Sequence, residues 1–320
     1  MPQFDWLSQL LQMILVKGQL EVRCAYSAPW RIDWPEASRH EIPYHIVLSG
    51  RATVENLETG KADELVGGDI ILFPHGSAHF LHDGSGQTPV KPFNRQISTG
   101  LMISENVGRN GCLEMLCGRF STRPPHDRII RNYLPNSLIV KCANVRREPG
   151  NEAASDQLSN LLMLMRMESA DNRPEAYSIL NSFTPPLFTL ILRAASESGQ
   201  TSTGLLSLMG HPRLAPAISA MFAEPAWAWT LPNLAELCNM SRATFVRHFQ
   251  DRLGGSAMEL LADIRISLAA NELKKPGVST EAVADLVGYR SVVAFRRLFT
   301  GKTGMTPGQW RRHAREDIVA

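Results

Sequence analysis

The chain has 320 residues, of which 44% are hydrophobic and 20% charged, and its formal net charge is only +2. This length is sufficient for two domains with separate cores, and the balanced composition excludes a fibrous, low-complexity or disordered protein. The apolar runs are shorter than a membrane span, and the five cysteines include no CxxC pair of the kind that binds zinc. We therefore expect a protein of the cytoplasm whose cysteines are reduced.

The first predicted element is an amphipathic helix within residues 1–17. Its apolar stripe, at helical spacing, consists of Trp6, Leu7, Leu10, Leu11 and Ile14. Asp5 and the lack of a basic segment before the apolar stretch argue against a signal peptide. The pattern leaves open whether this helix packs on the first domain or on a partner.

Residues from about Cys24 to about Val140 predict a β-rich domain. Apolar runs at 44–48 and 69–73 are typical of strands, and glycines punctuate the sequence between such runs. Short strands with regular glycine turns favour a sandwich or a barrel.

Helical spacing replaces the strand pattern after about Ala153. Leu158, Leu161 and Met165 recur at intervals of three and four residues. A stretch rich in Ser, Gly and Thr follows at 196–203 and is typical of a linker.

Three parts are therefore expected along the chain. Residues 1–150 form the β-rich domain, residues 151–204 a helical segment with its linker, and residues 205–320 an all-helical domain. The last part is mildly basic, with 14 Lys and Arg against 10 Asp and Glu. This excess suits phosphate contact by local patches and not by a strongly cationic surface.

A pattern in the last ninety residues occurs twice, fifty positions apart. Its members are Phe245, Arg247, Phe249 and Gly254 in the first copy, and Phe295, Arg297, Phe299 and Gly304 in the second. Each copy follows a short apolar helix and a turn, which predicts a repeated helix-turn-helix. The two phenylalanines of each copy are four residues apart and share a buried helix face, so the arginine between them points outward.

A helix over Ala257–Lys274 is predicted between the two copies, and at 1.5 Å per residue it spans about 27 Å. Ser241 and Ser291 are plausible N-caps of the two outward-facing helices. A rigid spacer of this length can hold the two helices about one DNA turn, roughly 34 Å, apart.

Eight outward positions are the candidate DNA contacts. They are Arg242, Ala243, Val246 and Arg247 in the first copy, and Val292, Val293, Arg296 and Arg297 in the second. Arginine pairs with guanine through two hydrogen bonds, and valine or alanine suits the methyl group of thymine. The alternative for any single arginine is a phosphate contact or a surface salt bridge.

The stretch from Trp229 to Arg312 resembles the DNA-binding domain of the AraC family of transcriptional regulators. The matching residues are Trp229-Thr230, Ala235-Glu236-Leu237, Met240-Ser241-Arg242, Phe245, Phe249, Gly254, Arg265, Ala269, Leu273, Ala284, Val287-Gly288-Tyr289 and Gly304-Met305-Thr306-Pro307. Ala257 departs from the pattern, since a proline is usual there, but alanine still favours the start of a helix.

The resemblance implies a sequence-specific transcription regulator. Its partners would be a double-stranded DNA operator, RNA polymerase and a second copy of the chain as a homodimer. It favours an activator, although the residues alone leave the direction of control open.

The first domain resembles a cupin. Gly68-Asp69, Pro74-His75-Gly76 and His79 fit the second cupin motif, and His45 with Gly50 resembles a degenerate first motif. The expected fold class is therefore α+β: an N-terminal cupin-like β-barrel with a helical dimerisation segment, followed by an all-α double helix-turn-helix.

His45 and His79 are the candidate ligand-binding residues, in a small-molecule pocket inside the barrel. The alternative is a barrel that only dimerises, with both histidines hydrogen-bonded in its core. Because the first motif lacks its other metal ligands, we expect no metal, no cofactor and no enzymatic activity. A metal-dependent cupin oxygenase with an inert helical appendage is the rival from another functional class.

Thiol sensing is a further alternative for the signal, with Cys24, Cys112 and Cys117 as the candidate residues. Arg23 beside Cys24, and Arg119 near Cys117, are positioned in sequence to lower a thiol pKa. The competing interpretation is a set of buried, inert thiols.

Overall fold

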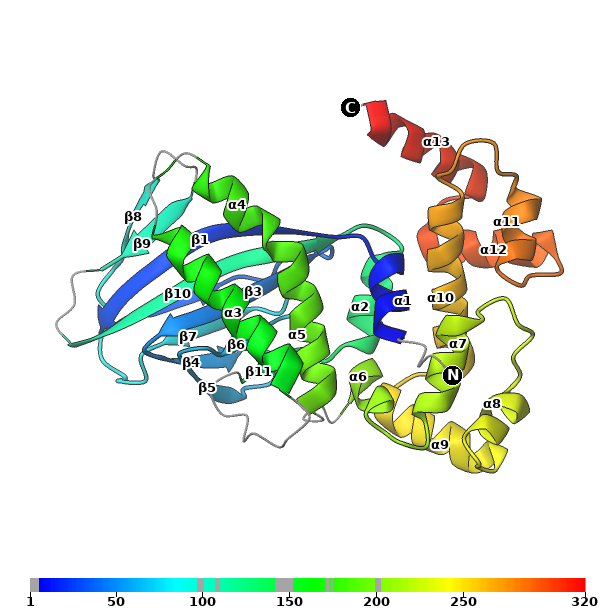
Figure 1. Ribbon diagram of the computed structural model, residues 1–320, viewed down its shortest axis with the longest axis horizontal. Coiled ribbons are helices and arrows are strands. Elements are labelled where there is room, and N and C mark those ends of the chain that lie inside the picture. The colour runs from blue at the N-terminus through cyan, green and yellow to red at the C-terminus, as the bar shows by residue number, and fades with distance from the viewer. Residues whose placement is uncertain are drawn as a thin grey trace. The chain divides into compact units, whose positions relative to one another are not determined.

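The computed structural model describes residues 6–96, 101–106, 110–141, 152–170, 173, 175–198 and 203–319, and Figure 1 shows the chain. It divides into two compact units. A sheet unit comprises Val16–Thr122 and Pro135–Ser198, and a helical unit comprises Met1–Leu15, Arg123–Leu134 and Gly199–Ala320. The units interleave along the chain, whereas the sequence predicted contiguous domains.

The sheet unit carries the strands β1 (Val16–Ala28), β2 (Arg31–Trp34), β3 (Glu41–Ser49), β4 (Arg51–Asn56), β5 (Ala62–Val66), β6 (Ile70–Leu72), β7 (His79–His82), β8 (Phe93–Gln96), β9 (Met102–Glu105), β10 (Asn110–Thr122) and β11 (Leu138–Val140). Within the described residues they form a seven-stranded sheet, ordered β11-β6-β3-β10-β1-β9-β8, and a four-stranded sheet, ordered β2-β7-β4-β5. The α+β class and the sheet-rich N-terminal region predicted from glycine-punctuated strands are confirmed.

The long strands β1 and β10 form the middle of the larger sheet. They pair antiparallel from Val16 opposite Thr122 to Ala28 opposite Asn110. Strand β4 alternates exposed and buried positions, as a strand with one face on a core must. Its inward side chains, Ala52 and Val54, belong to a core cluster that also contains residues of β1, β3, β7 and β10.

Gly118 of β10 lies where its neighbours leave no room for a side chain. A Cβ atom built on it would lie 2.2 Å from the carbonyl oxygen of Gln19 and 2.5 Å from the hydroxyl oxygen of Tyr44. Tyr44 is fully buried and stacks on Phe120, with ring centroids 4.5 Å apart. The glycine is therefore required for the close approach of β1, β3 and β10.

The described part of the sheet unit also contains three helices: α3 (Glu152–Ser169), α4 (Ala176–Ser182) and α5 (Thr184–Ser198). Pro185 and Pro186 lie in the first turn of α5, where proline is tolerated. Part of the predicted linker, residues 199–202, lies outside the described residues.

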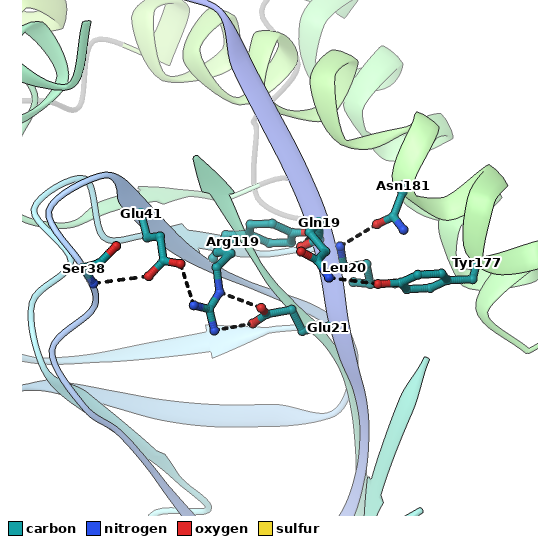
Figure 2. Close-up of polar contacts among 9 residues, drawn as sticks. Gln19, Leu20, Glu21, Ser38, Glu41, Arg119, Tyr177 and Asn181 are labelled. Carbon is teal, nitrogen blue, oxygen red and sulfur yellow. Dashed lines mark hydrogen bonds and ion pairs between the residues drawn. The ribbon is translucent and has the colours of Figure 1, made fainter. Parts of the chain in front are cut away.

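Helix α4 is attached to β1 by two side chains (Figure 2). The Gln19 amide nitrogen donates to the Tyr177 hydroxyl over 3.1 Å, and the Leu20 backbone N–H donates to the Asn181 side-chain oxygen over 2.8 Å. In the same view Arg119 of β10 bridges carboxylates of the two neighbouring strands, Glu21 of β1 and Glu41 of β3. These contacts tie the three central strands to one another and to α4.

The helical unit contains α1 (Trp6–Met13), α2 (His126–Tyr133), α6 (Gly204–Met209), α7 (Ala215–Ala223), α8 (Leu231–Leu237), α9 (Arg242–Leu253), α10 (Ala257–Glu272), α11 (Thr280–Leu286), α12 (Val292–Thr303) and α13 (Pro307–Val319). Among the described helices, none has both the length and the apolar composition needed to cross a membrane.

The predicted N-terminal helix is present as α1, and it lies in the helical unit. Trp6, Leu7 and Leu10 are buried, and the rings of Trp6 and Phe222 of α7 have centroids 6.2 Å apart. Helix α2, which the sequence placed within the β-rich domain, also belongs to the helical unit. Packing of an apolar helix face, and not position along the chain, decides to which unit each segment belongs.

Candidate nucleic-acid interface

The first helix-turn-helix consists of α8 and α9. The Thr230 hydroxyl caps α8 by accepting from the Asn233 N–H, and the Ser241 hydroxyl caps α9 by accepting from the Thr244 N–H over 3.2 Å. Asn239, in the turn between the helices, has a φ of 50°, a conformation that asparagine tolerates better than most residues. Gly254 ends α9 in the left-handed conformation.

The second helix-turn-helix, α11 and α12, repeats this construction. Ser279 caps α11, and the Ser291 hydroxyl caps α12 by accepting from the Ala294 N–H over 3.3 Å. Gly288, in the turn, has a φ of 82°, and Gly304 ends α12 in the left-handed conformation. The predicted caps Ser241 and Ser291 are both confirmed.

The phenylalanines of both copies face inward, as predicted. Phe245 and Phe249 are buried, with ring centroids 5.4 Å apart. Phe295 and Phe299 are also buried at 5.6 Å, and Phe299 meets Trp310 of α13 edge to face at 5.8 Å. Because each pair fixes the inner face of its helix, the residues between the phenylalanines point outward.

The candidate contacts of the first copy, Arg242, Ala243, Val246 and Arg247, are all exposed on α9. Neither Arg242 nor Arg247 forms an ion pair with any residue that the structure describes. Their guanidinium groups are therefore available to an external anion.

The second copy is less uniform. Arg297 and Val293 are exposed, Val293 to 78%, whereas Val292 is half-buried against the core of the second copy. Arg296 is exposed and forms a 2.8 Å ion pair with Glu281 of α11. The exposed contact surface of this copy is therefore centred on Val293 and Arg297, with Arg296 held by a carboxylate.

The spacer helix α10 begins at Ala257, as predicted despite the missing proline. Ser256 and Glu259 form a capping box, in which each side chain accepts from the other residue's backbone N–H. The helix has 16 residues and a length of about 24 Å, and it ends at Glu272, two residues before the predicted end at Lys274.

Two arginines of this domain, Arg265 and Arg290, were not among the candidate DNA contacts predicted from the sequence. Arg265 of α10 donates over 2.7 Å to the carbonyl oxygens of both Pro225 and Trp227, and so holds the segment that precedes α8. Arg290 is exposed immediately before the cap of α12. Arg290 could have been found by its position beside Ser291, but the role of Arg265 depends on residues about forty positions away.

In the sheet unit, His45 and His79 lie against each other. Their Nε2 atoms are 2.7 Å apart, and Nδ1 of His79 contacts the carbonyl oxygen of Ser77 at 2.8 Å. Burial lowers the pKa of His79 to about 4 and holds that of His45 well below its usual value, so both are neutral at pH 7. The Phe73 ring stacks on His79 with centroids 3.6 Å apart.

Nδ1 of His45 itself and the neighbouring Trp34 Nε1 are buried, and neither has a hydrogen-bond partner among the described residues. Within the described part of the chain, no three His, Cys, Asp or Glu side chains converge as metal ligands would. A separate cavity of about 210 Å³ in the same unit lies between β3 and α3, lined in part by Val47, Leu162 and Arg166.

The cysteine candidates divide into a buried pair and an exposed residue. Cys24 and Cys117 are buried with their Sγ atoms 4.0 Å apart, whereas Cys112 is exposed. Burial raises the pKa of Cys117 well above its usual value. The expectation that Arg119 lowers this pKa is therefore wrong, because burial of the thiol dominates and raises it. The Arg119 guanidinium is paired with Glu21 and Glu41. Cys142 lies outside the described residues.

Two family models match this chain. The one described as "Cupin" matches residues 5–197, and the one described as "Helix-turn-helix domain" matches residues 234–313.

Individual relatives match the chain over nearly its whole length. A putative AraC-like transcription regulator of Streptomyces lividans is 33% identical over 319 residues, covering 97% of this chain and 98% of the relative. The RCS-specific HTH-type transcriptional activator RclR of Escherichia coli is 26% identical over 313 residues, covering 98% and 99%. Among solved structures, unsaturated-fatty-acid-bound ToxT of Vibrio cholerae is similar over 93% of this chain and 94% of ToxT, with 12% identity and a TM-score of 0.35.

Proposed function

Because this chain belongs to the AraC-like transcription regulators, with a cupin domain ahead of a helix-turn-helix domain, we propose that it reads two successive major grooves of one operator with α9 and α12. Its family makes it a DNA-binding transcription regulator and not an enzyme.

The observation that carries the proposal is the equivalence of Arg247 and Arg297. Each is exposed, lies between two buried phenylalanines, and belongs to a helix with a serine cap and a glycine end. A guanidinium beside small or apolar side chains suits a guanine flanked by thymine methyl groups. Alanine and valine occupy those neighbouring positions, at Ala243, Val246 and Val293.

The test begins with selection of an operator from random double-stranded DNA by the purified full-length chain. Arg247→Glu and Arg297→Glu should each abolish the gel shift of that operator, because a carboxylate facing the groove is repelled by phosphates and cannot pair with guanine. Arg51→Glu, on the exposed face of β4, makes the same charge change and should bind normally. Unchanged affinity in both test variants would reject the assignment.

For the signal, we propose that the cupin domain binds a small molecule at His45 and His79. The unpartnered atoms His45 Nδ1 and Trp34 Nε1 support this, because buried polar groups normally have a hydrogen-bond partner. Ligand binding would act by population shift, changing how the two DNA-reading units of a dimer are held.

Native mass spectrometry of freshly purified chain tests this directly. We expect an organic adduct that is lost in His79→Phe, while Leu57→Ala, an exposed control in the same unit, retains it. Stoichiometric iron in place of an organic adduct would favour the metal-binding alternative. No adduct in any preparation would favour a barrel that serves only dimerisation.

We propose that the regulator acts as a homodimer through α3. Met163, Leu164 and Met167 of α3 are 62%, 51% and 62% exposed, and large apolar side chains exposed together indicate a binding surface. Met163→Lys with Met167→Lys should give a monomer by light scattering, while Leu57→Lys, with 60% exposure, should not. A dimer that persists in the double variant would place the interface elsewhere.

The DNA-bound dimer is expected to contact RNA polymerase and to act in the cytoplasm. Activation is the expected direction, since the similar RclR is named an activator. Transcription in vitro from a promoter carrying the selected operator measures that direction directly.

A second candidate signal is oxidation of Cys24 and Cys117. Their 4.0 Å separation favours it, and the name of RclR, an RCS-specific activator, adds support. Oxidation by diamide would remove two electrons and two protons from the thiols, form one S–S bond, and reduce diamide to its hydrazine. Burial and the raised pKa of Cys117 oppose it, because the thiolate is the reactive form.

The redox candidate predicts that diamide changes operator affinity. Cys24→Ala and Cys117→Ala should each block the change, whereas Cys112→Ala, at an exposed thiol, should not. A response that survives both of the first two substitutions would exclude this pair as the sensor.

A further inference from the structure

Helix α2 is a part of the helical unit that DNA recognition, as proposed above, does not use. In the sequence it lies between strands β10 and β11 of the sheet unit. Its buried residues include Ile129, Ile130 and Tyr133, and the helix contacts α10 and α6. The chain therefore inserts one helix from its sheet-forming half into the unit that carries both helix-turn-helix copies.

The hydroxyl of Tyr133, the last residue of α2, is bonded to a buried carboxylate on the spacer helix. Tyr133 donates to Asp263 Oδ2 over 2.5 Å, and Lys302 of α12 donates to Asp263 Oδ1 over 2.5 Å. Asp263 is only 4% exposed, and Arg128 of α2 lies 3.9 Å from it. A buried carboxylate is stable only when it is paired, so this contact holds α2, α10 and α12 in one arrangement.

The backbone of the same tyrosine meets the first copy. Gly204 opens α6 with a φ of 85°, and a Cβ atom on it would lie 2.7 Å from the carbonyl oxygen of Tyr133. One turn further along α6, the Ser207 hydroxyl accepts from Arg252 in the last turn of α9, over 3.1 Å. Tyr133 is thus connected to α9 through α6, and to α12 through Asp263 and Lys302.

We propose that Tyr133 is a positioning residue that sets the spacing and rotational phase of α9 relative to α12. This inference rests on the proposed reading of two successive grooves. One base pair inserted between the two groove sites rotates the second site by about 34°, since a DNA turn holds about 10.5 base pairs. A unit whose two recognition helices are rigidly positioned rejects such an operator, and a loosened unit tolerates it.

The test uses full-length Tyr133→Phe, which removes one hydroxyl and keeps the ring. Its affinity is measured on the selected operator, on versions with one base pair inserted or deleted between the groove sites, and on a fragment with one groove site. We expect wild type to discriminate between spacings, and Tyr133→Phe to lose at least fivefold of that discrimination. Binding to the single-site fragment should not change, because no contact with DNA is altered.

Tyr177→Phe is the matched control, since it removes a tyrosine hydroxyl whose bond to Gln19 lies within the sheet unit. Asp263→Asn is a second variant of the cluster and should relax the spacing preference in the same way. Full spacing discrimination in both folded cluster variants would overturn the inference. A wild-type chain that selects no operator would instead remove the proposed function, and this inference with it.

Discussion

Replacing Gly118 with alanine should destabilise the sheet unit strongly. The added methyl group would lie 2.2 Å from the carbonyl oxygen of Gln19, and 2.5 and 2.7 Å from the hydroxyl oxygen and the Cζ atom of Tyr44. Ordinary contacts of a Cβ atom are 3.4–4 Å, so the neighbours must move by about 1 Å or more.

Neither neighbour can move freely. The Gln19 carbonyl belongs to β1, whose backbone is paired with β10 around Gly118. The Tyr44 ring is fully buried and stacked on Phe120. Overpacking of a well-filled core costs about 1–3 kcal/mol, and two rigid neighbours place this substitution at the upper end, about 3 kcal/mol.

Urea unfolding followed by circular dichroism measures the loss as a lower midpoint at an unchanged slope. Gly301→Ala is the matched control, because Gly301 lies inside α12 and, beyond the helix's own backbone, no described residue lies within 4 Å of an added Cβ. That change should stabilise the helix by about 0.5–1 kcal/mol. A Gly118→Ala variant as stable as wild type would refute the close approach of the three central strands.

Phe295→Ala should cost about 3–5 kcal/mol of stability by leaving a cavity beside Phe299, measured by urea unfolding. Only a small loss would mean that the inner face of α12 is not packed. Glu281→Gln should raise operator affinity most at low salt, because it releases Arg296 from its exposed ion pair; Glu272→Gln, which removes a carboxylate paired with Lys275, is the control in the gel shift. Affinity that does not change would place Arg296 away from the duplex. Stability should fall as pH is lowered from about 6.5 towards 4, because the unfolded chain binds protons there that His79 and His126, each with a folded pKa of about 4, do not. Unfolding midpoints at pH 7 and pH 5 that coincide would contradict the burial of both rings.

The double helix-turn-helix could be deduced from the sequence because its determinants are local. Phe245 and Phe249 share a face through a four-residue interval, and Ser241 caps a helix whose N–H groups lie three residues away. Such signals depend only on helix geometry, so a repeat of fifty residues displays them twice. The outward direction of Arg247 follows from the same geometry.

The contacts that join distant parts of the chain had no such signal. Tyr133 and Asp263 are 130 positions apart, and no local sequence pattern predicts that the Tyr133 hydroxyl donates to the Asp263 carboxylate. Burial likewise raises the pKa of the Cys117 thiol, whereas Arg119, two positions away in the sequence, suggested a lowered pKa.

The sequence by itself thus determined the two helix-turn-helix copies, their caps and the spacer between them, because each depends on interactions within a turn or two. Only the tertiary structure decided that α1 and α2 join the helical unit, and that the Nε2 atoms of His45 and His79 hydrogen-bond directly to each other. Those outcomes depend on which apolar surfaces pack together between segments that are far apart in the sequence. The spacing of residues within one segment does not predict that packing.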